Sequence, residues 1–241
     1  MDIVQIQGHI KEYDWGNSSF IPALLSQDED GKSKAELWFG THPNGDAKVV
    51  ETGQQLSEFL AQDSLHWFGQ EHLDCFGDQL PLLLKVLAID KPLSIQVHPT
   101  KAQAEEGWAK EELTRAHQKK ELWNYKDPNR KAEVIYALTP ITAMCGFRPL
   151  KQIIPVLKLL IPNGFAKHFG YLDAEIEDAD KLLARLFEEL YTMQPEELAV
   201  LIDEYIASLK KHDELPFATG DGAFLESKGI VLSCYAAYPK D

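Results

Sequence analysis

The sequence predicts a mainly β domain at residues 1–148 and an α-helical domain at residues 149–241. Two observations predict this order. Up to residue 147, the apolar residues come in short runs separated by turn residues, which is typical of strands. After Pro149, they recur at the spacing of one helix face. Because 44% of the 241 residues are hydrophobic, the chain can bury a sizeable core.

Five apolar runs of the first domain are expected to be strands. They lie at residues 35–39, 81–89, 93–97, 134–138 and 144–147. Residues that break regular structure separate the runs and supply the turns that a β architecture needs. These breakers are Pro43-Asn44-Gly45, Lys91-Pro92, Asp127-Pro128-Asn129 and Thr139-Pro140. Two short helices are expected to interrupt the strands, at residues 56–68 and 101–119.

The second domain is expected to contain two amphipathic helices. The first has its apolar face at Leu182, Leu183, Leu186, Phe187, Leu190 and Tyr191. The second begins at Pro195, which suits a first helical turn, and a loop begins near His212. A Gly-rich connector at 220–222 then precedes an apolar stretch at 230–238, which fits either a strand or a short helix.

The charge of the chain excludes some partners. Acidic residues outnumber basic ones 38 to 24, and a net charge of −14 disfavours nucleic acid. A small phosphorylated metabolite needs only a few local cations and stays compatible. No apolar run approaches the roughly 18 residues of a membrane span, and the start lacks a signal-peptide pattern. We therefore expect no membrane partner, a cytoplasmic location, and reduced cysteines at Cys75, Cys145 and Cys234.

Three polar residues, Ser94, Gln96 and His98, alternate with apolar residues in segment 93–99. On a strand they would share one face, where Gln96 and His98 could converge on one ion. A solvated strand face shows the same alternation, and glutamine is an unusual zinc ligand. The pattern alone leaves both interpretations open.

Charged residues mark two further positions. Glu133 directly precedes an apolar run and is either a strand-end charge in water or a ligand turned inward, with Lys131 on the same face. Lys85 lies inside the apolar run 81–87. It either has a carboxylate or charged ligand nearby, or extends to solvent from an edge strand. Trp15 and Trp38 are expected in the core, and His42 at a turn.

These segments, in this order, resemble type I phosphomannose isomerases. The matching segments are Tyr13-Asp14-Trp15-Gly16 and residues 35–43, 84–87 and 92–99. Residues 125–133 are similar to the family signature Y-x-D-x-N-H-K-P-E, and the match continues through residues 137–148. The resemblance covers the chain to about residue 150, and the helical part agrees with a helical insertion of the family by position and pattern.

The resemblance implies a cupin-type (jelly-roll) β domain and a zinc-dependent aldose-ketose isomerase. Such an enzyme interconverts mannose 6-phosphate and fructose 6-phosphate through a cis-enediol or cis-enediolate, which zinc stabilises. The implied zinc ligands are Gln96, His98 and Glu133. The residues implied to line the sugar phosphate site are Trp15, Lys85, Ser94 and Lys131. Lys131 and Lys85 are the candidate catalytic residues, with Lys131 the better candidate for assisting proton transfer.

The sequence departs from the family pattern in three ways. Arg130 replaces the signature His, and Ala132 replaces its Pro. The family also places a fourth zinc ligand and a catalytic Arg in a second β half, before which we expect this chain to end. Three protein ligands and water would hold zinc less tightly, and exposed apolar edges would invite a chain that supplies the missing cupin half.

Two other functions stay open on the sequence. The first is a non-catalytic cupin-like protein that binds a metal or a sugar phosphate, which the departures favour. The second is an interaction protein that pairs with another chain through the helical faces at 182–209.

Overall fold

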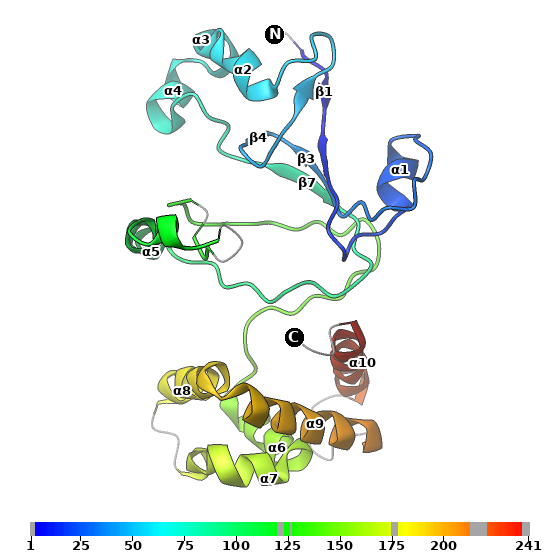
Figure 1. The fold of residues 1–241 in the computed structure, drawn as a ribbon, viewed down its shortest axis with the longest axis vertical. Coiled ribbons are helices and arrows are strands. Elements are labelled where there is room, and N and C mark those ends of the chain that lie inside the picture. The colour runs from blue at the N-terminus through cyan, green and yellow to red at the C-terminus, as the bar shows by residue number, and fades with distance from the viewer. Residues whose placement is uncertain (1–2, 120–122, 126, 175–177, 213–220, 238–241) are drawn as a thin grey trace. The chain divides into compact units, whose positions relative to one another are not determined.

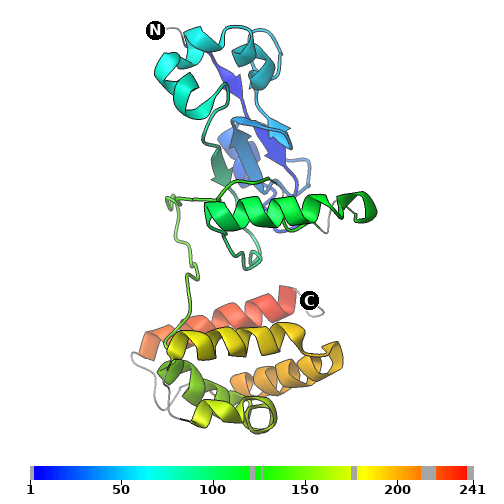
Figure 2. The same ribbon diagram turned by 90° about the vertical axis from the view of Figure 1, so that its left-hand side faces the viewer.

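The computed structural model describes residues 3–119, 123–125, 127–174, 178–212 and 221–237, with side chains in the last range from residue 228 (Figure 1, Figure 2). The chain forms two compact units. One comprises Met1–Leu93 and Gly220–Asp241, and the other comprises Ser94–Thr219. These units divide the chain differently from the predicted domains 1–148 and 149–241, which stay a prediction.

The first unit contains a three-stranded antiparallel sheet in the order β2-β3-β7. Its strands are β2 (His9–Lys11), β3 (Glu36–Phe39) and β7 (Leu84–Leu87). Trp38 of β3 lies opposite His9 on one side and Lys85 on the other. Directly opposite residues share a face of the sheet, so the indole lies between the two side chains. The strands predicted within 35–39 and 81–89 are confirmed.

Two shorter antiparallel pairs and four helices complete the ordered part of residues 3–93. The pairs are β1 (Ile6–Gln7) with β6 (Lys48–Val49) and β4 (Thr41–His42) with β5 (Gly45–Asp46). The helices are α1 (Phe20–Leu24), α2 (Leu56–Ala61), α3 (Ser64–Phe68) and α4 (Gln70–Phe76). One helix was expected at 56–68, but the structure has two, α2 and α3. The Asp63 side chain accepts the N–H of His66 and so caps the start of α3.

The second unit contains a helical bundle. Its helices are α6 (Leu150–Leu160), α7 (Pro162–Gly164), η3 (Phe165–Phe169), η4 (Gly170–Asp173), α8 (Ala179–Thr192) and α9 (Pro195–Lys211). Their apolar faces form one core, with Phe169 fully buried. Both predicted helices are confirmed as α8 and α9, and the helix before His212 ends where expected. Figure 2 shows these helices packed side by side.

Two other helices differ from the predictions. The helix expected at 101–119 is shorter, as α5 (Lys101–Glu112) followed by η1 (Arg115–His117). The prediction of a connector at 220–222 is wrong at residues 221 and 222, because both belong to α10 (Asp221–Ala237). The apolar stretch from residue 230 to residue 237 is helical, which was one of its two predicted structures. Gly220 and Tyr238 lie outside the described residues. No helix in the described part of the chain is long and apolar enough to cross a membrane.

Three predicted strands, at 93–97, 134–138 and 144–147, are wrong. None of these residues joins a strand of the described part of the chain, although their sequences alternate or run apolar. Their apolar side chains are open to solvent, with Ile95 76% exposed and Val134 97% exposed. A strand needs a partner for its backbone groups, and these segments have none among the described residues. The β content is therefore lower than predicted, and small sheets accompany the helices.

Candidate metal centre

Four of the predicted site residues come together in the second unit. The Glu133 Oε2 atom lies 3.3 Å from the Nε2 atom of His98. Lys131 donates a hydrogen bond of 2.7 Å from Nζ to Oε1 of Gln96, and its Nζ lies 3.6 Å from Oε1 of Glu133. One imidazole, one carboxylate, one amide and one ammonium therefore share a site, although Gln96 and Glu133 are 37 positions apart in the sequence.

The donor atoms of this cluster fit a zinc ion. Zinc binds imidazole nitrogen and carboxylate oxygen at about 2.0–2.2 Å, which places two donors of a tetrahedral site roughly 3.3 Å apart. The distance of 3.3 Å between His98 Nε2 and Glu133 Oε2 agrees with that spacing. The amide oxygen of Gln96 could complete a set of three, once Lys131 turns its ammonium away.

The cluster is open to solvent. The side chain of His98 is 36% exposed and that of Glu133 is 49% exposed. Across the described residues, no three His, Cys, Asp or Glu side chains gather closely enough to hold a metal. Among the described residues, the predicted candidate for a third protein donor is therefore Gln96. An exposed set of three donors leaves coordination positions for water or a substrate.

The backbone brings these residues together without a strand. Gln96 and His98 lie in an extended segment that ends at Pro99, where Thr100 caps helix α5. The prediction that Ser94, Gln96 and His98 share a strand face is therefore wrong, because the segment has no strand partner. Ser94 is exposed, and its side chain makes no hydrogen bond to another described residue.

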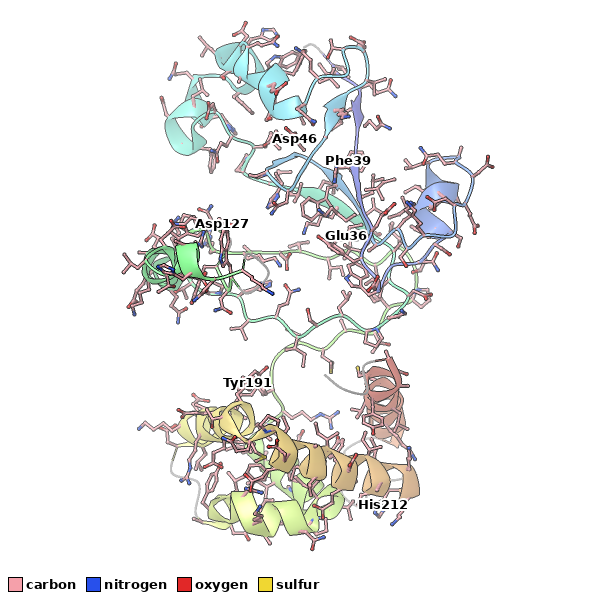
Figure 3. The ribbon with its side chains drawn as sticks, in the orientation of Figure 1. Glu36, Phe39, Asp46, Asp127, Tyr191 and His212 are labelled. Carbon is pink, nitrogen blue, oxygen red and sulfur yellow. The ribbon has the colours of Figure 1, made fainter. Side chains whose placement is uncertain are left out.

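Lys85 lies in the first unit, where its ammonium has aromatic and acidic neighbours. Its Nζ is 4.7 Å from the centre of the Trp38 ring and 4.0 Å from Oε2 of Glu36. The indole N–H of Trp38 donates to the same carboxylate. Glu36 and Phe39, labelled in Figure 3, mark the two ends of β3. Lys85 therefore has the carboxylate neighbour that one interpretation expected. It also lies on an edge strand, but its side chain is only 27% exposed.

Trp15 and Trp38 differ in burial. Trp38 is 6% exposed and belongs to the core, as predicted. Trp15 is only half-buried and stacks on Tyr13 at 5.8 Å between ring centres. Burial raises the pKa of the Tyr13 phenol. Gly16 follows without room for a Cβ, because Ala35 lies directly against it.

The other sequence predictions in this region concern ordinary residues. His42 lies at the turn between β4 and β5, as expected, and its Nδ1 accepts the backbone N–H of Asn44. The three cysteines are free, as predicted.

Sequence reasoning missed two lysines. Lys11 places its Nζ 5.0 Å from the centre of the Trp38 ring, so cations approach that indole from two strands. Lys101 donates from Nζ to the backbone oxygen of Pro128 at 3.1 Å. The signal for Lys101 was its position three residues after His98, at the start of the predicted helix.

Two open hollows of the second unit do not contain the cluster. The first, of about 290 Å³, is lined by Lys167, His168, Glu189, Thr192, Met193 and Glu197. The second, of about 440 Å³, lies between α5 and the segment around Tyr125. Neither hollow contains the residues of the cluster at Glu133. The candidate site is therefore identified by its donor atoms and not by the size of a cavity.

Comparisons with known proteins point to one family. Residues 3–150 match the family described as phosphomannose isomerase type I, catalytic domain. The mannose-6-phosphate isomerase of Macaca fascicularis is 32% identical over 96% of this chain and 56% of its own length. That of Homo sapiens is 40% identical over 62% of this chain and 36% of its own length.

Solved structures of one bacterial relative also match. Mannose 6-phosphate isomerase from Salmonella typhimurium in the apo form gives a TM-score of 0.80 at 29% identity. The same enzyme bound to substrate (f6p) and zinc gives 0.80 at 28% identity. Each match covers 98% of this chain and 56% of the Salmonella chain.

The chain thus spans about half the length of several relatives that it matches. The matched family region, residues 3–150, nevertheless covers more than half of this chain and contains the whole cluster around Glu133. This chain therefore belongs to the type I phosphomannose isomerase family.

Proposed function

We propose that this chain takes part in the zinc-dependent interconversion of mannose 6-phosphate and fructose 6-phosphate. The observation that carries the proposal is the cluster of Gln96, His98, Lys131 and Glu133, with its zinc-like donor spacing of 3.3 Å. Family membership supports the same function. The Salmonella relative is described as bound to both f6p and zinc.

Gln96, His98 and Glu133 are the residues that would hold the metal. When bound there, zinc would act as a Lewis acid toward the carbonyl and neighbouring hydroxyl of the sugar. The exposure of His98 and Glu133 leaves the sugar free to approach these groups from solvent.

Lys131 is the proposed acid and base group of this site. The reaction moves one proton between C1 and C2 of the sugar and one between their oxygens, so a proton carrier beside the metal donors is required. The Lys131 ammonium lies 2.7 Å from Gln96 Oε1 and 3.6 Å from Glu133 Oε1. When it turns away from Gln96 to make room for the metal, it remains on the segment beside the donors. It can donate a proton or a hydrogen bond to the oxygen on which negative charge develops.

Trp15, Lys85 and Ser94 are proposed to line the sugar phosphate site. Lys85 is suited to an anionic group, because its ammonium is only partly exposed and is held by the Trp38 ring. Ser94 precedes Gln96 by two residues and has an exposed hydroxyl free to bond a ligand.

The cupin jelly roll is also part of this proposal. Segments 93–97, 134–138 and 144–147 have strand-like sequences but solvent-exposed apolar side chains, among them Ile95 and Val134. A chain that carries a second cupin half would supply strand partners and cover this surface. The proposed partners are therefore a sugar phosphate and such a β segment.

A non-catalytic function is the second candidate. Arg130 and Ala132 stand where the family signature has His and Pro. The cluster also contains only three metal donors among the described residues. A protein of this kind would bind zinc or the sugar phosphate without turning it over.

The test is isomerase turnover and zinc content of the purified chain. The variants are Gln96→Ala and His98→Ala, and the exposed His117→Ala is the matched control. We expect turnover and bound zinc in the unchanged chain and in His117→Ala, and loss of both in the two site variants. Zinc binding without turnover would favour the second candidate. A folded chain without zinc would contradict the isomerase, and one that binds neither zinc nor mannose 6-phosphate would contradict both.

A further inference from the structure

Helix α5 connects the two segments that carry the metal donors. It begins at Lys101, three residues after His98. A capping box fixes this beginning, since Thr100 Oγ1 accepts the N–H of Gln103, and Gln103 Oε1 accepts the N–H of Thr100 at 3.0 Å. The chain leaving His98 is therefore fixed to the first turn of the helix.

The first residue of α5 holds the segment that leads to Glu133. Nζ of Lys101 donates to the backbone oxygen of Pro128 and to Oδ1 of Asn129, both at 3.1 Å. The backbone N–H of Asn129 donates in turn to Oδ1 of Asp127 at 2.7 Å, which closes a local turn. Asn129 is only two residues before Lys131 and four before Glu133.

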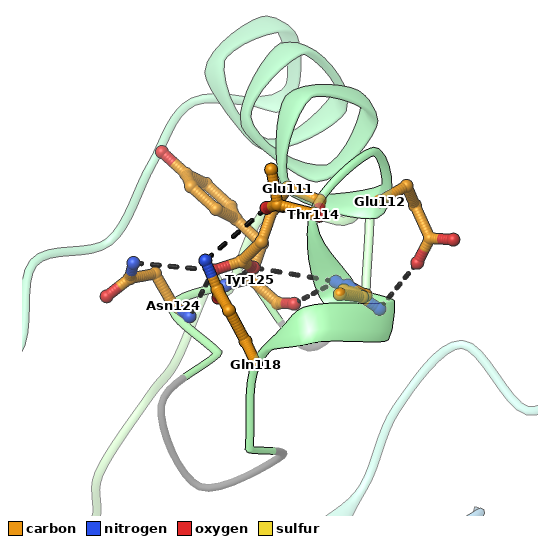
Figure 4. Close-up of polar contacts among 7 residues, drawn as sticks. Glu111, Glu112, Thr114, Gln118, Asn124 and Tyr125 are labelled. Carbon is orange, nitrogen blue, oxygen red and sulfur yellow. Dashed lines mark hydrogen bonds and ion pairs between the residues drawn. The ribbon is translucent and has the colours of Figure 1, made fainter.

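The last turn of α5 holds the start of the same segment. The two carboxylate oxygens of Glu111 accept the backbone N–H groups of Asn124 and Tyr125, each at 2.8 Å (Figure 4). These bonds lower the pKa of Glu111. Arg115 donates to the backbone oxygen of Tyr125. Gly107 has no room for a Cβ, because the Tyr125 ring lies against its backbone.

Arg115 is itself immobilised. Its guanidinium lies 3.6 Å from the centre of the Trp108 ring and 4.5 Å from that of Trp123. It also pairs with Glu112 at 2.7 Å, and its side chain is only 10% exposed. A guanidinium held between two indoles loses little further freedom when it bonds a backbone oxygen, so this end of the contact is rigid.

These contacts matter because the donor segments have no sheet to align them. Neither Gln96 and His98 nor Lys131 and Glu133 lie in a strand. Metal donors must nevertheless be held to within about 0.2 Å of their bonding distances, which requires support from residues around them.

We propose that α5, with η1 that follows it, is a brace in which Lys101, Glu111 and Arg115 are positioning residues for the metal centre. The brace fixes residues 123–125 and 127–129 and so sets the distance between His98 and Glu133. The inference rests on the proposed zinc site for its role, but its geometry can be tested without the metal.

The test compares Lys101→Met and Glu111→Gln with Lys110→Met and Glu106→Gln. The two controls alter an exposed ion pair of 2.6 Å within the same helix, and that pair makes no hydrogen bond to the described residues 123–125 and 127–129. The first readout is zinc affinity, measured by competition with a chromogenic chelator. We expect each brace variant to weaken zinc binding about tenfold or more, as supporting residues of metal sites do. Lys101→Arg should restore most of the affinity, and both controls should bind zinc as the unchanged chain does.

The second readout is amide hydrogen exchange without zinc. Glu111→Gln should speed exchange by about tenfold at Asn124 and Tyr125, whose N–H groups it bonds. Lys101→Met should speed it at Asn129, whose N–H donates to Asp127 in the turn that Lys101 holds, while the controls should not. A brace variant with unchanged zinc affinity and unchanged exchange would overturn the brace. If the unchanged chain binds no zinc, the proposed function fails. In that case the exchange rates alone decide the brace, and unchanged rates overturn it.

Discussion

The helical bundle at 150–211 and the donor segments at 94–100 and 130–147 belong to one unit but differ in what stabilises them. In the bundle, backbone hydrogen bonds close within each helix, and the apolar faces meet around Phe169. The donor segments also contain runs of apolar residues, yet these side chains are exposed, with Val134 97% exposed. Helices form from local contacts, whereas strands require a partner from elsewhere. Side chains of α5 therefore do for the donor segments what a sheet would otherwise do.

The largest expected difference between the two regions is in stability. Phe169→Ala should lower the free energy of unfolding by about 3–5 kcal/mol, because it empties a fully buried site in the bundle core. Val134→Ser should change it by less than about 0.5 kcal/mol, since that side chain is exposed. Urea unfolding followed by circular dichroism measures both. A large loss in Val134→Ser would mean that the residue is buried in solution, which would break the comparison.

A smaller effect is expected where α5 meets the segment around Tyr125. Gly107→Ala places a methyl group against the Tyr125 ring and should cost about 1–3 kcal/mol through overpacking. Gly170→Ala is the control, because no atom lies within 4 Å of its Cβ position. Thermal unfolding of both variants tests the contact. Equal stability of the two would show that Tyr125 does not pack against α5.

The bundle contains a comparable contact between a carboxylate and the backbone. Glu204 of α9 accepts the N–H groups of Asn163 and Gly164 at the start of α7, each at 2.9 Å. Glu204→Ala should therefore lower the free energy of unfolding by about 1.5–3 kcal/mol, the range for hydrogen bonds to a charged group. Asp203→Ala, next to it but exposed, is the control for urea unfolding. A similar loss in the control would assign the effect to α9 and not to these bonds.

The sequence predicted the helices of the bundle well because their information is local. The apolar spacing from Leu182 to Tyr191 and the proline at 195 were sufficient for α8 and α9. The same logic was wrong for the segment at 134–138, since apolar character does not reveal whether a partner strand is present. Helix α10 was left undecided for a related reason, as a short apolar run fits both structures.

The candidate site was predicted by resemblance and not by periodicity. Gln96, His98, Lys131 and Glu133 do meet, but not through the strand face that the alternation suggested. No pattern in the sequence indicated the role of Glu111. That role depends on the backbone N–H groups of Asn124 and Tyr125, which lie 13 and 14 residues later in the chain. Contacts of a side chain with distant backbone are not encoded in any residue pattern.

The smallest predicted effect is a titration of Glu111. Its pKa lies below the usual value of about 4.3, because the N–H groups of Asn124 and Tyr125 stabilise the carboxylate. A lowered pKa in the folded state means that the contribution to stability is fully present above about pH 4.3 and is lost as the pH falls through the lower folded value. The brace should therefore hold at neutral pH and loosen only in acid.

Amide proton shifts measured by NMR between pH 7 and pH 2.5 would show this titration. The amide signals of Asn124 and Tyr125 should move together, with a midpoint below about 4.3. Glu111→Gln should abolish that movement, because the amide side chain does not ionise. Glu106→Gln should leave it intact, since Glu106 pairs with Lys110 and not with the loop. Signals that move at the usual pKa, or that still move in Glu111→Gln, would mean that another group holds the loop, and the donor segments would then depend on something other than α5.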